Sequence, residues 1–299
     1  MSDSEVLALF EQERRRLTGL AYRMLGSLAD AEDVLQDAWL RWQKADRASV
    51  DNPAAFLTAV VTRLSLDRLK SARARRETYV GPWLPEPLLE GADLAIEPEA
   101  EIAADLSVAL LLALERLSPL ERAAFLLHDI FERPFSEVAR ILDREEGACR
   151  VLANRARQHV QLDRVRFPLR GDEGERYARA FATAAKAGDF SALQGLLAEN
   201  AVLTADGGGK KAAIPRPMNG RDAIARFFAR IASAPKLPAV RRQRFLAING
   251  LPGFLTEFEG GDLQTTALEI ADGRITALYV VRNPDKLERL RGLLEGPST

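Results

Sequence analysis

PFSEVARILDREEGACRVLANRARQHV, residues 134–160, is the stretch that decides the fold of this chain. Apolar residues recur at helical spacing from Phe135 to Leu142, and Ser136 is placed to cap that helix. Asp143 interrupts the pattern, because Asp tolerates turn and left-handed geometry. Two short helices joined by a tight turn predict a helix-turn-helix. The inner stripe of its second helix is made of Ala148, Cys149, Leu152, Ala153, Ala156 and Val160.

The opposite face of that second helix is polar and basic, with Val151 among its members. Arginine fits phosphates and guanine edges, and asparagine fits an adenine edge. The pattern therefore predicts DNA contacts from Arg150, Asn154, Arg155 and Arg157. An ordinary helical hairpin with a solvated basic face is the alternative, since helix-turn-helix patterns have many look-alikes.

Length and composition indicate a globular protein of two or more domains. The chain has 299 residues, of which 47% are hydrophobic and 28% are charged. Its single cysteine excludes an internal disulfide framework and favours a reducing cytoplasm. The charged N-terminus is unlike a signal peptide, and no run of about 18 apolar residues occurs. We expect a cytoplasmic protein without membrane association.

Net charge is −1, so only the distribution of charge supports nucleic-acid binding. A first basic cluster comprises Arg63, Arg68, Lys70, Arg73, Arg75 and Arg76, and a second zone comprises Arg150, Arg155, Arg157, Arg164, Arg166 and Arg170. The stretch 86–105 between them is acidic and has no basic residue. Two basic helices separated by an acidic linker predict two DNA contacts on one flexible chain. Basic residues late in a helix also complement its dipole, which is the alternative for the first cluster.

Three helices are expected before the linker, over residues 5–25, 30–44 and 53–76. Gly26 ends the first, and Asn52 caps the third with Pro53 at its first position. The second helix leaves an acidic and polar face, which is either a solvated surface or a binding surface. That face consists of Glu32, Asp33, Gln36 and Asp37.

The linker TYVGPWLPEPLLEGADLAIEP, residues 78–98, contains prolines and glycines that forbid a regular helix. It is too apolar for an inert tether, so we expect it to dock on its own protein or on a partner. Its apolar residues are Tyr79, Trp83, Leu84, Leu88 and Leu89. A helix over 100–117 follows, and Ser118 then caps a helix that begins at Pro119.

Three stretches follow one another along the chain, and their order is more specific than any one of them: LTGLAYRMLGSLADAEDVLQDAWLRW, NPAAFLTAVVTRLSLDRLKSARARRE and LSPLERAAFLLHDIFERPFSEVARIL. Together with the helix-turn-helix they resemble regions two and four of the extracytoplasmic-function sigma factors. The resemblance implies that the chain binds core RNA polymerase through the acidic face and promoter DNA through both basic helices. The first basic cluster would serve the −10 element and the helix-turn-helix the −35 element. Glu145, Glu146 and the turn residue Asp143 depart from the family's usual pattern, so the −35 preference is expected to be unusual.

The last third changes character and predicts an α+β cone. A long helix, a Gly-Asp turn, a short helix and a strand cover 174–206, and a further helix covers 219–234. Four alternating segments follow, with a strong hairpin signal at Asp272–Gly273. Helices followed by a curved antiparallel sheet give this architecture. With YVGPWLPEP, DGGGK at 206–210 and NPDKL at 283–287, the chain resembles the sigma-factor group that carries a C-terminal SnoaL-like extension.

This resemblance implies that the extension controls the two sigma domains in cis. We expect domains at 1–77, 78–99, 100–168 and 169–299, with the cone docking on the linker. The candidate contacts are Trp83, Leu84, Pro85, Asp206, Lys210, Asn283, Asp285 and Lys286. Beside three glycines, Asp206 is expected in a hinge or an exposed loop. An unknown small ligand or protein at the cone is a further possible partner, because binding one arrangement better would shift the balance.

The sequence of the cone shows no acid–base pair that indicates a particular reaction, so we expect that the protein is not an enzyme. Asp189 is read as a turn residue and Asp262 as part of a hairpin, while His128 and Cys149 are read as structural. Without a His/Cys cluster, neither a metal nor a cofactor is expected. Two alternatives stay open: an operator-binding regulator with a ligand-sensing cone, and a SnoaL-like isomerase or hydrolase fused to a DNA-binding module.

Overall fold

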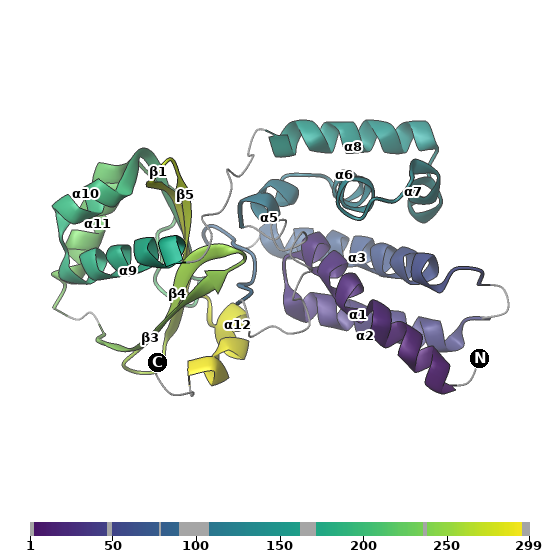
Figure 1. The fold of residues 1–299 in the computed structure, drawn as a ribbon, viewed down its shortest axis with the longest axis horizontal. Helices are drawn as coiled ribbons and strands as arrows, with labels where there is room; N and C mark the ends of the chain where they lie inside the picture. Colours follow the sequence, from purple (N-terminus) through teal and green to yellow (C-terminus); the bar gives the residue numbers. More distant parts are fainter. Residues whose placement is uncertain are drawn as a thin grey trace. The chain divides into compact units, whose positions relative to one another are not determined.

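The computed structural model describes residues 3–46, 50–77, 79–89, 108–161, 172–235 and 238–294, without the side chains of residues 3, 71–77 and 161. The chain forms two compact units. The first contains Met1–Glu77 and Asp93–Arg164, and the second contains Thr78–Ala92 and Val165–Thr299. The described part of the linker, residues 79–89, therefore belongs to the same unit as the C-terminal domain (Figure 1).

The first unit opens with three packed helices, α1 (Asp3–Leu25), α2 (Leu28–Lys44) and α3 (Pro53–Glu77). Their core includes the fully buried side chains of Leu17, Trp42 and Leu57. Gly26 adopts a φ of 68° just after α1, and the side chain of Asn52 accepts from the amide of Ala55 at 3.0 Å, as the sequence predicts.

A second helical group follows in the same unit: α5 (Val108–Glu115), α6 (Pro119–Phe125), the π-helical turn η4 (Leu126–Ile130), α7 (Phe135–Leu142) and α8 (Glu146–Gln161). Ser118 and Glu121 form a reciprocal capping box at the start of α6. Asp143 adopts the left-handed conformation with a φ of 53°, which turns the chain between α7 and α8. The predicted helix-turn-helix is present. Of the stretch 100–117 expected to be helical, the structure describes residues 108–117, and the helix ends at Glu115.

Two local expectations within this motif are wrong. Ser136 does not cap α7, because the helix begins one residue earlier and Pro134 occupies the capping position without a side-chain hydrogen bond. Ala148 is exposed, because it lies in the first turn of α8, before the inner stripe begins. Cys149, Ala153 and Ala156 are fully buried and form that stripe.

The second unit is the predicted α+β domain. Three helices, α9 (Asp172–Ala187), α10 (Phe190–Leu196) and α11 (Arg221–Ala232), accompany a six-stranded sheet of order β2-β1-β6-β5-β4-β3. The strands are β1 (Leu197–Asp206), β2 (Met218–Asn219), β3 (Val240–Ile248), β4 (Leu251–Phe258), β5 (Leu263–Ala271) and β6 (Arg274–Val281). Neighbouring strands are antiparallel except β1 and β6, which are parallel.

Both faces of this sheet are covered. Helices α9, α10 and α11 bury one face around Phe181, Phe254 and Leu268 (Figure 1). On the other face Leu255 and Val281 are also buried, and α12 (Pro284–Leu287) and the 3₁₀ turn η5 (Glu288–Leu294) contact β5 and β3 there. The described linker is hydrogen-bonded to Asp206 at the end of β1 and to Asn249, which follows β3.

Candidate functional site

The described linker is held by the C-terminal domain at what we call the linker seat, formed by Asp206, Asn249, Asn283 and Lys286. At its centre, the backbone amide of Leu84 donates to Oδ2 of Asp206 at 2.9 Å. Nζ of Lys286 donates both to the carbonyl of Leu84 and to Oδ2 of Asp206. One buried ion pair therefore satisfies both backbone polar groups of one linker residue.

Asp206 ends β1 and is completely buried, so its expected place in a hinge or an exposed loop is wrong. Besides Leu84 and Lys286, its carboxylate accepts from the hydroxyl of Tyr79 at 2.5 Å and from the amide of Gly208 at 2.9 Å. A buried carboxylate is tolerated only when paired and hydrogen-bonded, and four donors meet that requirement here.

Tyr79 anchors the start of the described linker. Its hydroxyl donates to Asp206 and accepts from Nδ2 of Asn283 at 2.8 Å. Burial, and secondarily the Asp206 carboxylate, raise the pKa of the Tyr79 phenol well above its usual range. Tyr79 is therefore held as the neutral phenol, which is the form that can donate to Asp206.

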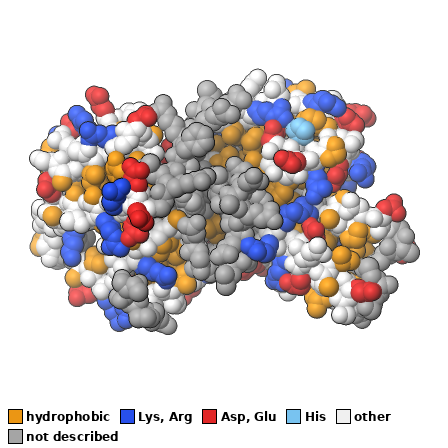
Figure 2. Space-filling view, viewed as in Figure 1, with side chains coloured by type: hydrophobic (Ala, Val, Ile, Leu, Met, Phe, Trp, Pro, Cys, Tyr) orange, Lys and Arg blue, Asp and Glu red, His pale blue; other side chains and the backbone are white. Residues whose placement is uncertain are grey.

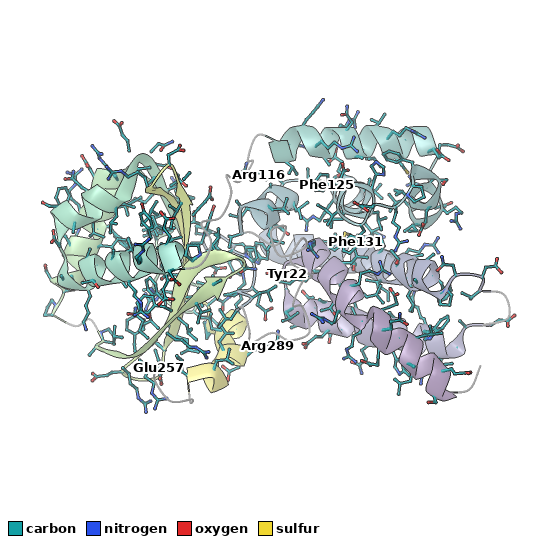
Figure 3. The ribbon with its side chains drawn as sticks, in the orientation of Figure 1. Tyr22, Arg116, Phe125, Phe131, Glu257 and Arg289 are labelled. Carbon is teal, nitrogen blue, oxygen red and sulfur yellow. The ribbon has the colours of Figure 1, made fainter. Side chains whose placement is uncertain are left out.

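Aromatic and acidic side chains of the linker add further contacts. Nζ of Lys286 lies 4.3 Å from the ring centre of Trp83 and 5.1 Å from that of Tyr79, in cation–π geometry. Glu86 is 6% exposed, and one of its carboxylate oxygens lies 3.9 Å from Nη1 of Arg289 on η5. Figure 3 labels Arg289. Leu84 is fully buried and Pro85 is buried beside it.

The end of the described linker continues the sheet. The backbone amide of Asn249 donates to the carbonyl of Leu88 at 2.8 Å, and the side-chain oxygen of Asn249 accepts from the backbone amide of Leu88 at 3.2 Å. Leu89 then forms an antiparallel bridge with Ile248 on β3. Asn249 was not singled out from sequence; its place before Gly250 indicated only a turn between strands.

The DGGGK and NPDKL segments meet each other as well as the linker. A Cβ on Gly208 would collide with the carboxamide of Asn283, so this close approach requires glycine. Asn283 caps α12 by accepting from the amide of Asp285 at 3.1 Å. Lys210 and Asp285 form an ion pair at 2.7 Å, with their side chains 56% and 62% exposed. These two residues therefore link the segments to each other at the surface.

The outer face of α8 presents its predicted DNA contacts unequally. Asn154 and Arg155 are exposed. Arg150 is held by Glu146 at 2.8 Å and lies over the ring of Phe135 at 4.9 Å. Arg157 is two-thirds buried and forms a 2.5 Å ion pair with Asp129 of η4.

The acidic face of α2 and the basic cluster of α3 are brought together in the first unit. Nη1 of Arg68 lies 3.0 Å from Asp33 and 3.5 Å from Asp30, and its Nη2 lies 3.6 Å from Asp37. Glu32 and Gln36 are exposed on the same helix.

The other members of the basic cluster differ among themselves. Lys70 is exposed and pairs with Asp67 at 2.9 Å, while Arg63 reaches α7. The side chains of Arg73, Arg75 and Arg76 lie outside the described residues. On the face shown in Figure 2, basic and acidic side chains of the described residues are interspersed.

The residues considered for catalysis have structural roles. Asp189 caps α10 through the amide of Ala192 at 2.9 Å, and Asp262 pairs with Lys211. His128 stacks on Phe135 with ring centres 3.8 Å apart, and Cys149 is buried. Across the described ranges, no group of three or more His, Cys, Asp or Glu side chains is placed to hold a metal ion. Within the same ranges, no helix combines the length and apolar character needed to cross a membrane.

Comparisons with known proteins agree with this architecture. Residues 9–75 match sigma-70 region 2, and residues 107–160 match sigma-70 region 4. Together with a 40% identical relative that is named an extracytoplasmic-function sigma factor, these matches show that the chain belongs to the extracytoplasmic-function RNA polymerase sigma factors. The first three helices are its region two, and α5 to α8 form its region four, the pair that supports promoter-directed transcription initiation.

Particular relatives cover nearly the whole chain, including the C-terminal domain. It is 40% identical over 289 residues to the sigma factor SigJ of Mycobacterium tuberculosis, covering 93% of this chain and 91% of the relative. It is 30% identical to the probable sigma factor SigI of that species, covering 97% of this chain and 98% of the relative. The crystal structure of SigJ superposes with a TM-score of 0.73 and 36% identity, covering 95% of this chain and 98% of that one. These relatives are named as sigma factors and not as enzymes.

Proposed function

We propose that this sigma factor binds core RNA polymerase, directs it to a −10/−35 promoter, and is controlled in cis by its C-terminal domain through the linker seat. Region two would contact polymerase through Glu32, Asp33, Gln36 and Asp37 and the −10 DNA through α3. Region four would contact the −35 DNA through the exposed face of α8. We assign no catalytic role to the C-terminal domain.

One observation carries the proposed control: the Asp206–Lys286 pair binds the backbone of Leu84 in the middle of the linker. The linker joins regions two and four, so a domain that holds it limits the geometry that the two regions can adopt. A partner or small ligand that favours either the seated or the released linker would shift this balance.

Run-off transcription tests the proposal directly. Full-length chain is mixed with core polymerase and promoter DNA from the gene's own neighbourhood, beside a Lys286→Met variant that keeps the aliphatic stem but cannot bind the Leu84 carbonyl. We expect promoter-specific transcripts from both, in amounts that differ severalfold. Lys210→Gln is the matched control, because it removes a surface lysine of the same domain.

Two results would count against the proposal in different ways. No transcript, together with no binding to core polymerase in a pull-down, would contradict the initiation function. Equal transcript from wild type and Lys286→Met, with the linker demonstrably released in the variant, would contradict control through the seat.

A further inference from the structure

A second contact, separate from the linker seat, lies inside the first unit between α3 and the helix-turn-helix. The guanidinium of Arg63 on α3 donates to the carbonyls of Arg140 and Ile141, each at 3.0 Å. Both carbonyls lie in the last turn of α7, where a helix has no further amides of its own to offer. The next two backbone amides both donate to Ala139 instead. Arg63 therefore completes the C-terminus of α7, where a cation also suits the helix dipole.

Neighbouring side chains hold the same two regions together. Arg122 of α6 is 3% exposed, and its Nη1 donates to the carbonyl of Met24 on α1 and to Glu115 at 2.7 Å. The guanidinium of Arg23 lies 5.6 Å from the ring centre of Phe131, which follows η4 (Figure 3). Regions two and four thus pack against each other through arginines that reach across.

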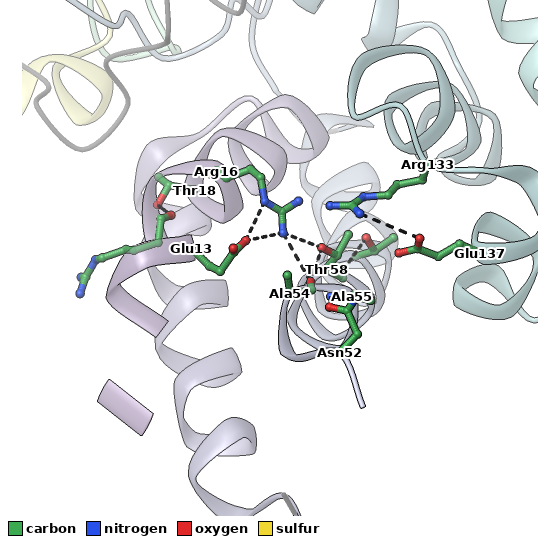
Figure 4. A network of polar contacts seen from close by, with 11 residues as sticks. Glu13, Arg16, Thr18, Asn52, Ala54, Ala55, Thr58, Arg133 and Glu137 are labelled. Carbon is green, nitrogen blue, oxygen red and sulfur yellow. Dashed lines mark hydrogen bonds and ion pairs between the residues drawn. The ribbon is translucent and has the colours of Figure 1, made fainter. Parts of the chain in front are cut away.

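This packing includes buried polar groups that are incompletely paired. Figure 4 shows Arg133 of region four extending toward Arg16 and Thr58 of region two. Among the described residues, Arg16 Nη1, Arg122 Nε, Arg133 Nε and Glu137 Oε1 are buried atoms without a hydrogen-bond partner. Water would satisfy such groups if the regions separated, so separation costs less than it would for a fully paired interface.

We propose that this packed arrangement is a closed, inactive state of the sigma regions and that Arg63 is its latch. The inference rests on the proposed −10/−35 function. Elements centred at −10 and −35 are about 85 Å apart along B-DNA, from about 34 Å per ten base pairs. A compact body the size of the first unit has a radius of gyration of about 15 Å and is roughly 40 Å across. Closed regions cannot reach both elements, so promoter binding must separate them.

Arg63 then has two mutually exclusive sets of acceptors. In the closed state its guanidinium is occupied by the α7 carbonyls, and in the open state it is released to DNA phosphates. The latch lies wholly in the first unit, so its contacts are separate from those of the linker seat. The chain consequently has two restraints: one on the linker, and one between the regions that the linker joins.

Distance measurement by pulsed electron paramagnetic resonance tests the latch in the full chain. Spin labels are placed at the exposed positions Asp67→Cys on α3 and Glu145→Cys before α8, in a Cys149→Ala background that removes the single native cysteine. We expect one short distance in the free protein and a longer one, by tens of ångströms, with core polymerase and promoter DNA. Arg63→Met should raise the ratio of long to short distances in the free chain about tenfold, as expected for loss of charge-assisted bonds.

Two further variants make the outcome decisive. Arg155→Met is the matched control, because it removes a proposed DNA contact from the exposed face of α8 and leaves the α7 carbonyls untouched. Phe131→Ala disturbs the same interface without removing a proposed DNA contact and should shift distances as Arg63→Met does. A free-chain distribution unchanged by Arg63→Met would overturn the latch, whatever the result for Phe131→Ala, and so would a short distance kept in a transcribing complex. Failure of wild type to bind polymerase would instead contradict the proposed function, since the free-chain comparison needs no polymerase.

Discussion

The ammonium of Lys286 and the carboxylate of Asp206 lie 2.7 Å apart, and together they bind both backbone polar groups of Leu84. The hydrogen bonds to Leu84 are made to its backbone and not to its side chain. The fit of the linker must therefore come from burial of Leu84, Pro85 and Leu88 and from the rings of Tyr79 and Trp83. This division of labour leads to separate predictions for the charged and the apolar parts of the seat.

Asp206→Asn should release the linker. The change leaves Lys286, whose side chain is 13% exposed, without its counter-ion, and breaking a buried pair in this way costs about 3–5 kcal/mol. Hydrogen exchange at the amides of residues 79–89 should accelerate by about a hundredfold or more. Lys210→Gln is the control, since an exposed pair is worth at most about 1 kcal/mol. Equal exchange in the two variants would show that the buried pair does not hold the linker.

Leu84→Ala should weaken docking without touching the ion pair. Truncating a fully buried leucine costs about 2–5 kcal/mol, and its backbone groups stay available to Asp206 and Lys286. Limited proteolysis of the linker should speed up accordingly, because cleavage follows the population of the open form. Val80→Ala, at a position 67% exposed, should leave the cleavage rate close to that of wild type.

Raising the pH should undock the linker through Tyr79. The pKa of its phenol is raised in the docked state, so its contribution is complete below the ordinary tyrosine pKa of about 10 and is lost as the pH rises above that value. Ultraviolet titration of the four tyrosines should include a late-ionising component from Tyr79. Tyr79→Phe should remove that late component, and its persistence in the variant would assign it to another tyrosine.

Arg155 and Arg157 should respond differently to alanine substitution, although both are proposed DNA contacts. Arg155 is exposed, so Arg155→Ala should weaken −35 DNA binding and, if the contact is to phosphate, lower the salt slope by about 1. Arg157 forms an ion pair with Asp129 at 2.5 Å, so the main effect of Arg157→Ala should be a lower Tm of the protein rather than weaker DNA binding. Fluorescence anisotropy across salt concentrations and thermal melts separate the two. Identical melts for both variants would argue against the structural role of Arg157.

Local signals predicted the local structure well. The turn at Asp143, the caps at Asn52 and Ser118 and the hairpin at Asp272–Gly273 each depend on residues within a few positions of one another. Family resemblance supplied the order of domains, which the matched regions and the SigJ structure bear out. The first residue of a helix was less predictable. Ser136 was expected to cap α7 and does not, and Ala148 was expected on the inner stripe of α8 and is exposed.

Asp206 shows what the sequence could not reveal. Its partners Tyr79 and Lys286 lie 127 and 80 positions away, so no local pattern reports them. The three following glycines suggested freedom of the backbone, whereas Gly208 is required for close packing against Asn283. Arg63 is a second case, because its basic character suggested DNA and its acceptors are backbone carbonyls with no signature in the sequence.

The linker seat also has a consequence for the order of events on the ribosome. Leu84 is made 202 residues before Lys286, and the seat is incomplete until that lysine has been added. At about 5–20 residues per second, a nascent chain carries an unheld linker for roughly 10–40 s. Both promoter-binding regions are complete during most of that interval. In each newly made molecule the linker is therefore unrestrained until the segment that contains Lys286 has been synthesised.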